Sequence, residues 1–192
     1  MWMLIAGLLL FIGMHSVRIV AEDGRTAAIG RLGPMGWKGV YSVVSGLGLA
    51  LIVAGYGASR EQPVDLWMPP AAMRHVAALL TLPAFVLLVA AYVPGSRLKA
   101  WVRHPMLLGV KLWALAHLLA NGRLADVVLF GTFLAWAVLA FRAARQRDRA
   151  AGNPPLPLHA GRDVLTSLVS IFAWIIFALW LHGPLIGVRP FG

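Results

Sequence analysis

Six apolar stretches restrict most strongly how this chain can fold. Each is about 16 to 22 residues long, near the length that an α-helix needs to cross about 30 Å of hydrocarbon. They run from Trp2 to Val20, Gly39 to Ala58, Met73 to Val93, Pro105 to Ala120, Leu124 to Phe141 and Val164 to His182. The pattern predicts an all-α fold, a polytopic transmembrane helix bundle of about six helices that forms a single domain over residues 1–192.

Composition excludes most soluble alternatives. The chain is 60% hydrophobic and 12% charged, whereas roughly a quarter of the residues in a soluble domain are charged. Its formal charge of +10 would fit a nucleic-acid partner only if the bases formed a compact patch. They are instead spread between the apolar stretches, so we expect a lipid bilayer and no nucleic acid. The chain has no cysteine, which excludes disulfides, thiolate metal sites and iron–sulfur clusters.

The basic residues also predict an orientation. The segments after the first, third and fifth stretches hold most of them: Arg18, Arg25, Arg31, Lys38, Arg97, Lys99, Arg103, Arg142, Arg145, Arg147, Arg149 and Arg162. The opposite segments hold Arg60, Arg74, Arg123 and Arg189. Because cytoplasmic loops are rich in Lys and Arg, both termini are expected outside the cytoplasm.

The first apolar stretch and one polar segment complete the predicted topology. The first stretch lacks a basic leader and a small-residue cleavage site, so we expect it to be a retained helix. The polar segment from Arg142 to Arg162 contains Pro154, Pro155 and Pro157. It is predicted to be a cytoplasmic linker.

Polar side chains inside the apolar stretches are the best functional clues. An ionisable group in hydrocarbon costs roughly 2.5 to 3.5 kcal/mol on insertion scales, so it usually faces the bundle interior or a cavity. The candidates are His15, Arg18, His104, Lys111, His117, Asn121 and Asp126. Spacing places His15 with Arg18, and His117 with Asn121, on shared helix faces. His104 and Lys111, seven residues apart, share another face.

Histidines on two different transmembrane helices are typical ligands of a b-type haem. The alternative is that each histidine makes a hydrogen bond to a neighbouring helix. For His104 a third interpretation is a helix start, because Pro105 suits the first helical turn. A zinc site is less well supported, since no HExxH spacing is present.

The segment from Arg103 to Gly122, RHPMLLGVKLWALAHLLANG, resembles the central signature of the NnrU family. Further stretches resemble family landmarks: His15-Ser16-Val17-Arg18, Gly39-Val40-Tyr41-Ser42, Gly55-Tyr56-Gly57 and Trp180-Leu181-His182. NnrU proteins are bacterial membrane proteins linked to nitrate, nitrite and nitric oxide metabolism. The resemblance covers nearly the whole chain and implies a multi-pass protein of the bacterial inner membrane, in which the outward-facing termini predicted from the basic residues would be periplasmic.

The NnrU family is in turn similar to zeta-carotene isomerase, a haem b enzyme of plants and cyanobacteria. That similarity implies His15 and His117 as iron ligands and cis-trans isomerisation of a carotenoid-like polyene as the reaction. In a nitrogen-oxide setting, the same iron would instead bind nitric oxide. Asn121 shares the helix face of His117, and the cationic side chains of Arg18, Arg103 and Lys111 would be available to haem propionates. The isomerase has a cysteine where this chain has Ala114, so a switch to a thiolate ligand is excluded.

Two other functions stay open. The chain is compatible with a non-catalytic accessory role for membrane enzymes of denitrification. Arg103-His104-Pro105, followed by Leu108 and Gly109, also resembles the cofactor region of small membrane methyltransferases that use S-adenosylmethionine, although the expected downstream acidic partners are missing.

The predicted depths of the two histidines disagree. His15 is expected about 7 to 8 Å from the inner face and His117 about 18 Å from it. His104 matches the depth of His15 better and is therefore the reserve ligand.

Overall fold

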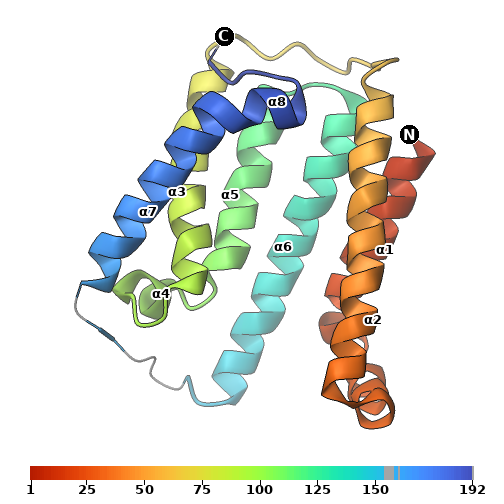
Figure 1. Cartoon of the computed structure of the whole chain (residues 1–192), viewed down its shortest axis with the longest axis vertical. Helices are drawn as coiled ribbons and strands as arrows, with labels where there is room; N and C mark the ends of the chain where they lie inside the picture. Colours follow the sequence, from red (N-terminus) through yellow and green to blue (C-terminus); the bar gives the residue numbers. More distant parts are fainter. Residues whose placement is uncertain (154–157, 160, 192) are drawn as a thin grey trace. The chain divides into compact units, whose positions relative to one another are not determined.

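The computed structural model describes residues 1–153, 158–159 and 161–191. The helices of this part are α1 (Trp2–Val20), α2 (Glu22–Ser59), α3 (Met73–Tyr92), α4 (Arg97–Val102), α5 (Pro105–Ala120), α6 (Leu124–Ala150), α7 (Arg162–Ile176), a π-helical turn (Phe177–Leu181) and α8 (His182–Ile186) (Figure 1). Five helical segments here are long and apolar enough to cross a membrane, namely α1, α2, α3, α6 and Arg162–Ile186, and α5 is a shorter apolar helix. The chain is therefore a multi-pass membrane protein, and the all-α prediction is confirmed.

Two helices extend further than their apolar stretches. The second helix begins at Glu22 instead of near Gly39, and the fifth apolar stretch continues as helix beyond Phe141 to Ala150. Helix formation outside hydrocarbon needs no apolar residues, and Arg, Ala and Gln are good helix formers. The prediction of a linker from Arg142 onward was therefore wrong for its first part. Its residues Pro154, Pro155 and Pro157 lie outside the described residues.

Contacts divide the chain into two compact units, each described here by itself. Unit 1 comprises Met1–Trp67 and Arg123–Trp136, and unit 2 comprises Met68–Gly122 and Ala137–Gly192. The α6 helix contributes its first half to unit 1 and its second half to unit 2. That the chain forms a single domain stays a prediction.

In unit 1, glycines allow the backbones of α1 and α2 to touch. A Cβ atom at Gly7 would lie 2.6 Å from the backbone nitrogen of Ile52, and one at Gly48 would lie 2.7 Å from that of Phe11. Gly55 packs on α1 in the same way. Small residues at such contacts are the usual means of close helix packing in membranes, where dispersion contacts replace the hydrophobic effect.

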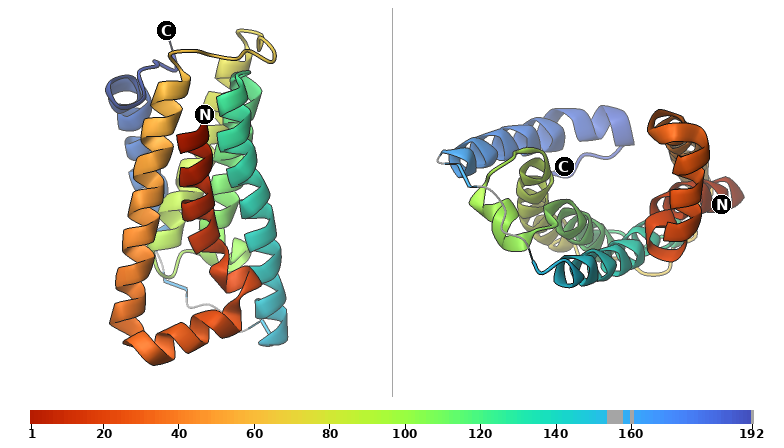
Figure 2. Two further views of the ribbon diagram at one scale, coloured as in Figure 1. Left: turned by 90° about the vertical axis from the view of Figure 1, so that its right-hand side faces the viewer. Right: turned by 90° about the horizontal axis from the view of Figure 1, so that it is seen from below.

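The α2 helix changes direction at Gly33. This glycine has φ 72° and ψ 165°, a conformation that a residue with a side chain rarely adopts, and Pro34 follows it. The stretch before the kink runs across the end of the α1–α2 pair (Figure 2). It begins with the exposed ion pair between Glu22 and Arg25 (2.9 Å). This polar stretch is suited to the membrane surface, and the longer part after Gly33 is suited to the span.

In unit 2, α3 packs against both α5 and α7 (Figure 1). Gly109 of α5 lies close to the backbone of Ala84, where an added Cβ would be 3.0 Å from the carbonyl oxygen. Trp174 of α7 donates a hydrogen bond from Nε1 to Oγ1 of Thr81 (3.1 Å). The outer face of this C-terminal helical segment exposes Leu168, Phe172 and Trp180.

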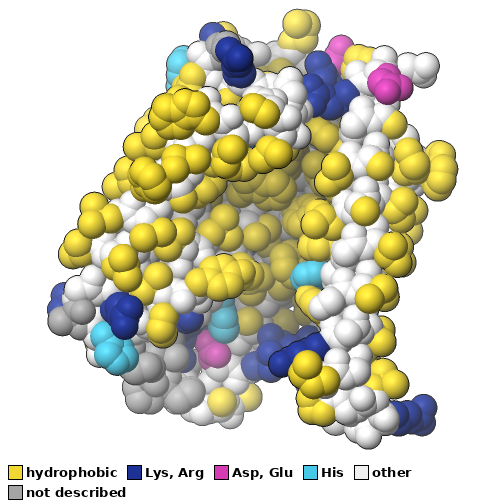
Figure 3. Space-filling view, in the orientation of Figure 1, with side chains coloured by type: hydrophobic (Ala, Val, Ile, Leu, Met, Phe, Trp, Pro, Cys, Tyr) yellow, Lys and Arg dark blue, Asp and Glu magenta, His cyan; other side chains and the backbone are white. Residues whose placement is uncertain are grey.

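Hydrophobic side chains extend along the exposed helix faces, and Lys and Arg side chains gather near the helix ends (Figure 3). A contiguous apolar surface of this kind is unfavourable in water but favourable in a bilayer. The surface of each unit therefore agrees with the membrane assignment.

Candidate functional site

His15 lies near the end of α1, in unit 1, among aromatic rings. Its ring stacks on Phe11, with 4.1 Å between ring centroids, and lies 5.2 Å from the ring of Tyr41 on α2. The ring of Trp136 on α6 meets it edge-on, with centroids 5.8 Å apart. His15 is half-buried. No acidic side chain pairs with it among the described residues.

The hydrogen bond of His15 defines which ring nitrogen can bind a metal. Its Nδ1 lies 2.7 Å from the carbonyl oxygen of Phe11. Since a carbonyl oxygen only accepts hydrogen bonds, Nδ1 must carry the proton. In the neutral imidazole the lone pair is then on Nε2, which is the form of histidine that ligates iron.

The indole Nε1 of Trp136, in unit 1, is a buried hydrogen-bond donor that lacks a partner within the part of the chain that the structure describes. The ring of Trp136 contacts His15. A buried donor left without a partner costs about 1 to 3 kcal/mol. Such groups commonly mark a place for a water molecule or a ligand.

Unit 1 also has a shallow apolar groove of about 300 Å³ between α1 and α6. It is lined by Ile5, Leu8, Leu9, Ile12, Gly13 and Ser16 of α1 and by Val128 and Thr132 of α6. The groove suits a hydrocarbon chain. His15 itself does not line it.

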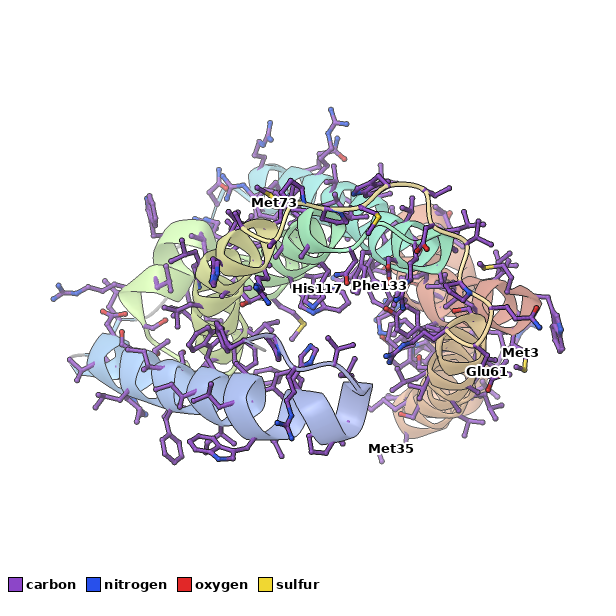
Figure 4. The ribbon with its side chains drawn as sticks, turned by 90° about the horizontal axis from the view of Figure 1, so that it is seen from above. Met3, Met35, Glu61, Met73, His117 and Phe133 are labelled. Atoms are coloured by element: carbon purple, nitrogen blue, oxygen red, sulfur yellow. The ribbon has the colours of Figure 1, made fainter. Side chains whose placement is uncertain are left out.

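His117 lies in the last turn of α5, in unit 2. Its Nδ1 is 2.8 Å from the carbonyl oxygen of Trp113, so this nitrogen also carries the proton. Asn121 donates to the carbonyl oxygen of His117 from both its backbone nitrogen (2.9 Å) and its side-chain amide (2.8 Å), which closes the helix. The His117 side chain projects on the side of α5 that faces α7 (Figure 4).

His15 and His117 thus share one local arrangement, in which Nδ1–H donates to the carbonyl oxygen four residues earlier. Histidines that ligate metals usually donate their other ring N–H to a carbonyl or a carboxylate, which sets the ring orientation. His15 belongs to unit 1 and His117 to unit 2. Their pairing on one iron is therefore a prediction that stays open.

His104 has a different environment in unit 2. It precedes the first turn of α5, and its Nε2 lies 3.0 Å from Oδ2 of Asp148. The same carboxylate oxygen is 3.8 Å from Arg103 and 3.7 Å from Arg145. Arg103 also donates to the carbonyl oxygen of Asn153 (3.0 Å). Asp148 therefore joins the segment before α5 to the end of α6.

Phe141 completes this contact between α5 and α6. The ring of His104 meets it edge-on at 6.1 Å, and Nζ of Lys111 lies 3.9 Å from its ring centroid. His104 and Lys111 therefore share a helix face, as their spacing predicted. Lys111 reaches a cation–π partner here.

The other polar candidates have separate surroundings. The side chain of Arg18 is exposed. Asp126 is 2% exposed and accepts hydrogen bonds from the Tyr56 hydroxyl (2.5 Å) and from the backbone nitrogen of Arg123 (3.1 Å). Asp126 thus caps α6 and joins it to α2 within unit 1.

Sequence reasoning missed several contacts of these histidines. Asp148 is the one acidic residue between Arg142 and Arg162, and this isolation was a usable signal for an ion-pair partner. Tyr41 and Trp136 gave no such signal, because their proximity to His15 depends on how the helices pack.

The sequence model for the family described as NnrU protein matches residues 3–190. The chain belongs to the NnrU family. No curated protein and no solved structure matches it. Among the described residues of this NnrU protein, no group of three or more His, Asp or Glu side chains is placed to hold a metal ion. A haem iron needs fewer protein ligands than such a group, since the macrocycle supplies four nitrogens.

Proposed function

We propose that this NnrU protein binds haem b in the membrane and that His15 and His117 are the iron ligands. The observation that supports this most directly is the hydrogen bonding of the two rings. In each, a backbone carbonyl holds the proton on Nδ1 and leaves the lone pair on Nε2. Both histidines belong to apolar helices, where an ionisable side chain without a function is costly.

The surroundings of His15 fit a large, flat, mostly apolar cofactor. Aromatic rings of Phe11, Tyr41 and Trp136 lie around the imidazole. The unpartnered Nε1 donor of Trp136 would bind an acceptor, such as a propionate oxygen of haem. The exposed guanidinium of Arg18, one turn from His15, would offer a charge for the same group.

His104 is less suitable as a ligand than the other two histidines. Its Nε2 is engaged by the carboxylate of Asp148, and it also contacts Phe141. Arg103 and Lys111 likewise have partners on α6, which are Asp148 and Phe141. The contacts of His104, Arg103 and Lys111 therefore stabilise the fold of unit 2, whether or not a cofactor is bound.

Haem b would supply an iron centre that binds nitric oxide or polarises a double bond of a polyene. The protein residues would orient the two imidazoles and exclude water from the iron. The apolar groove between α1 and α6 would accept a hydrocarbon chain, which suits the polyene. The link to nitrogen-oxide metabolism rests on what is known of the NnrU family in general.

We place the protein in the bacterial inner membrane, with the arginine-rich helix ends in the cytoplasm and both termini in the periplasm. The basis is the unequal distribution of Lys and Arg between the two sets of loops. Cysteine accessibility across the membrane would test it. The chain has no cysteine of its own, so Arg189→Cys and Arg149→Cys each introduce a single thiol. The thiol of Arg189→Cys should react with a membrane-impermeant thiol reagent in whole cells, whereas that of Arg149→Cys should not.

The haem proposal is tested by the absorption spectrum of the full-length protein purified with haem. We expect a Soret band that is lost in His15→Ala and in His117→Ala and kept in the control His75→Ala, because His75 is exposed. A colourless protein, or a Soret band that both variants keep, would contradict the proposal. Binding of S-adenosylmethionine to a colourless protein would instead support the methyltransferase, and binding of neither ligand would support the accessory role.

A further inference from the structure

The end of α6 carries a row of arginines that has no role in the proposed haem site. Beyond the apolar part, which ends at Phe141, the helix continues to Ala150. At about 100° per residue, positions 142, 145 and 149 lie within about 60° of one another around the helix. We call Arg142, Arg145 and Arg149 the arginine row.

The contacts of unit 2 show which way this row faces. Phe141 and Asp148 contact residues at the start of α5, and Ala144 between them is buried. These three residues form the packed face of this part of the helix. The arginine row lies beside that face, with Arg142 and Arg149 exposed and Arg145 partly exposed. Arg147 is also exposed, on the side roughly opposite the row.

The local charge is strongly positive. Among the described residues, Asp148 is the acid that pairs with an arginine of the row, and it is shared by Arg103, His104 and Arg145. The sequence from Ala150 to Gly161 adds no acidic residue. The exposed guanidinium groups of Arg142 and Arg149 therefore have positive charge to offer to an anion.

The depth of the row indicates which anion it meets. Arg142 directly follows the apolar segment, and the distance along the helix to Arg149 is about 10 Å. The polar region of one leaflet is about 5 to 8 Å thick, so a helix leaving the membrane carries this row through the layer of lipid phosphates. Guanidinium groups bind phosphate oxygens in a bidentate manner.

We propose that the arginine row binds the headgroups of anionic phospholipids, so that this NnrU protein collects such lipids around α6. The partner is a phosphodiester group held in the leaflet next to the end of the apolar segment. Each basic residue near a membrane surface contributes about fivefold to the affinity for anionic lipid. The contribution falls as salt is added.

Native mass spectrometry of the full-length protein, released from micelles with equal amounts of phosphatidylglycerol and phosphatidylcholine, tests this proposal. We expect preferential retention of phosphatidylglycerol, with an apparent affinity about 25-fold lower in Arg142→Gln/Arg149→Gln. The charge-matched comparison is between two single variants: Arg149→Gln, within the row, should lower the affinity about fivefold, whereas Arg147→Gln, on the opposite side of the same helix, should lower it less. Equal retention of both lipids, or equal effects of the two single variants, would overturn the proposal.

Two further measurements separate a lipid site from a free-anion site and from misfolding. Inorganic phosphate should not displace phosphatidylglycerol, and displacement at equal concentration would identify a site for the free anion and overturn the proposal. If the double variant does not fold, the salt dependence of the unmodified protein decides. The affinity for phosphatidylglycerol must fall as sodium chloride is raised, and an unchanged affinity would contradict the proposal.

Discussion

His15 in unit 1 and His104 in unit 2 are both histidines at helix ends, but different interactions position their rings. In the same unit as His15, the backbones of α1 and α2 touch through Gly7 and Gly48. The imidazole of His15 is hydrogen-bonded to a backbone carbonyl of its own helix. His104 is positioned by the carboxylate of Asp148 on another helix. One position depends on backbone packing, and the other depends on charge.

These two arrangements decide which histidine can serve a cofactor. A ring whose Nδ1 bonds to its own backbone keeps its orientation and has its lone pair on Nε2. A ring whose Nε2 bonds to a carboxylate acts as a cross-link between segments of the fold. Substitutions in each unit test these two ways of positioning a histidine.

The largest effect is expected from Gly48→Ala in unit 1. The added Cβ would lie 2.7 Å from the backbone nitrogen of Phe11, so α1 and α2 must move apart. We expect a loss of about 1 to 3 kcal/mol in the free energy of unfolding, together with a lower haem content. Thermal unfolding in detergent and the ratio of haem to protein measure the two effects.

Gly46→Ala is the matched control on the same helix, because nothing lies within 4 Å of a Cβ atom built there. It should leave both stability and haem content unchanged. If the two variants behave alike, the close approach of α1 and α2 does not position His15.

A smaller effect is expected from Asp148→Asn in unit 2. The change keeps the shape of the side chain but removes the charge that faces Arg103, His104 and Arg145. We expect a loss of about 1 kcal/mol, since the carboxylate is only partly buried. Unfolding measured at low and high salt should show that the loss shrinks as salt rises. The exposed Asp23→Asn serves as control, and an equal loss in both variants would remove the special role of Asp148.

The smallest effect concerns Lys111 and Phe141. A cation 3.9 Å from a ring centroid should give a coupling of about 0.5 to 1 kcal/mol. A double-mutant cycle with Lys111→Met and Phe141→Leu measures this coupling without the separate cost of each substitution. Additive effects would show that Lys111 is held by the surrounding lipid and water and not by the ring.

The sequence predicted the transmembrane helices well, because hydrocarbon thickness limits both their length and their composition. The bounds of α1 and α5 agree with the predicted ones. The polar start of α2 and the arginine-rich end of α6 were not predicted as helix, because apolar length says nothing about a helix that continues into water. The kink at Gly33 depends on a single backbone conformation.

The site was predictable only where its residues share a helix. Spacing alone placed His104 and Lys111 on one face, and Phe141 contacts both. The partners on other helices, such as Asp148 for His104 and Trp136 for His15, depend on packing that one sequence does not specify. Family resemblance identified His15 and His117 as a pair, which no helical spacing could do.

The ligation of iron in the purified ferric protein, measured by electron paramagnetic resonance and near-infrared magnetic circular dichroism, tests whether His15 and His117 hold one haem. Two imidazoles on one haem predict a low-spin iron with the signature of bis-histidine ligation. That signature should disappear in His15→Ala and in His117→Ala and persist in His104→Ala. A bis-histidine signature that persists without His15 or without His117, or that is lost without His104, would contradict ligation by His15 and His117.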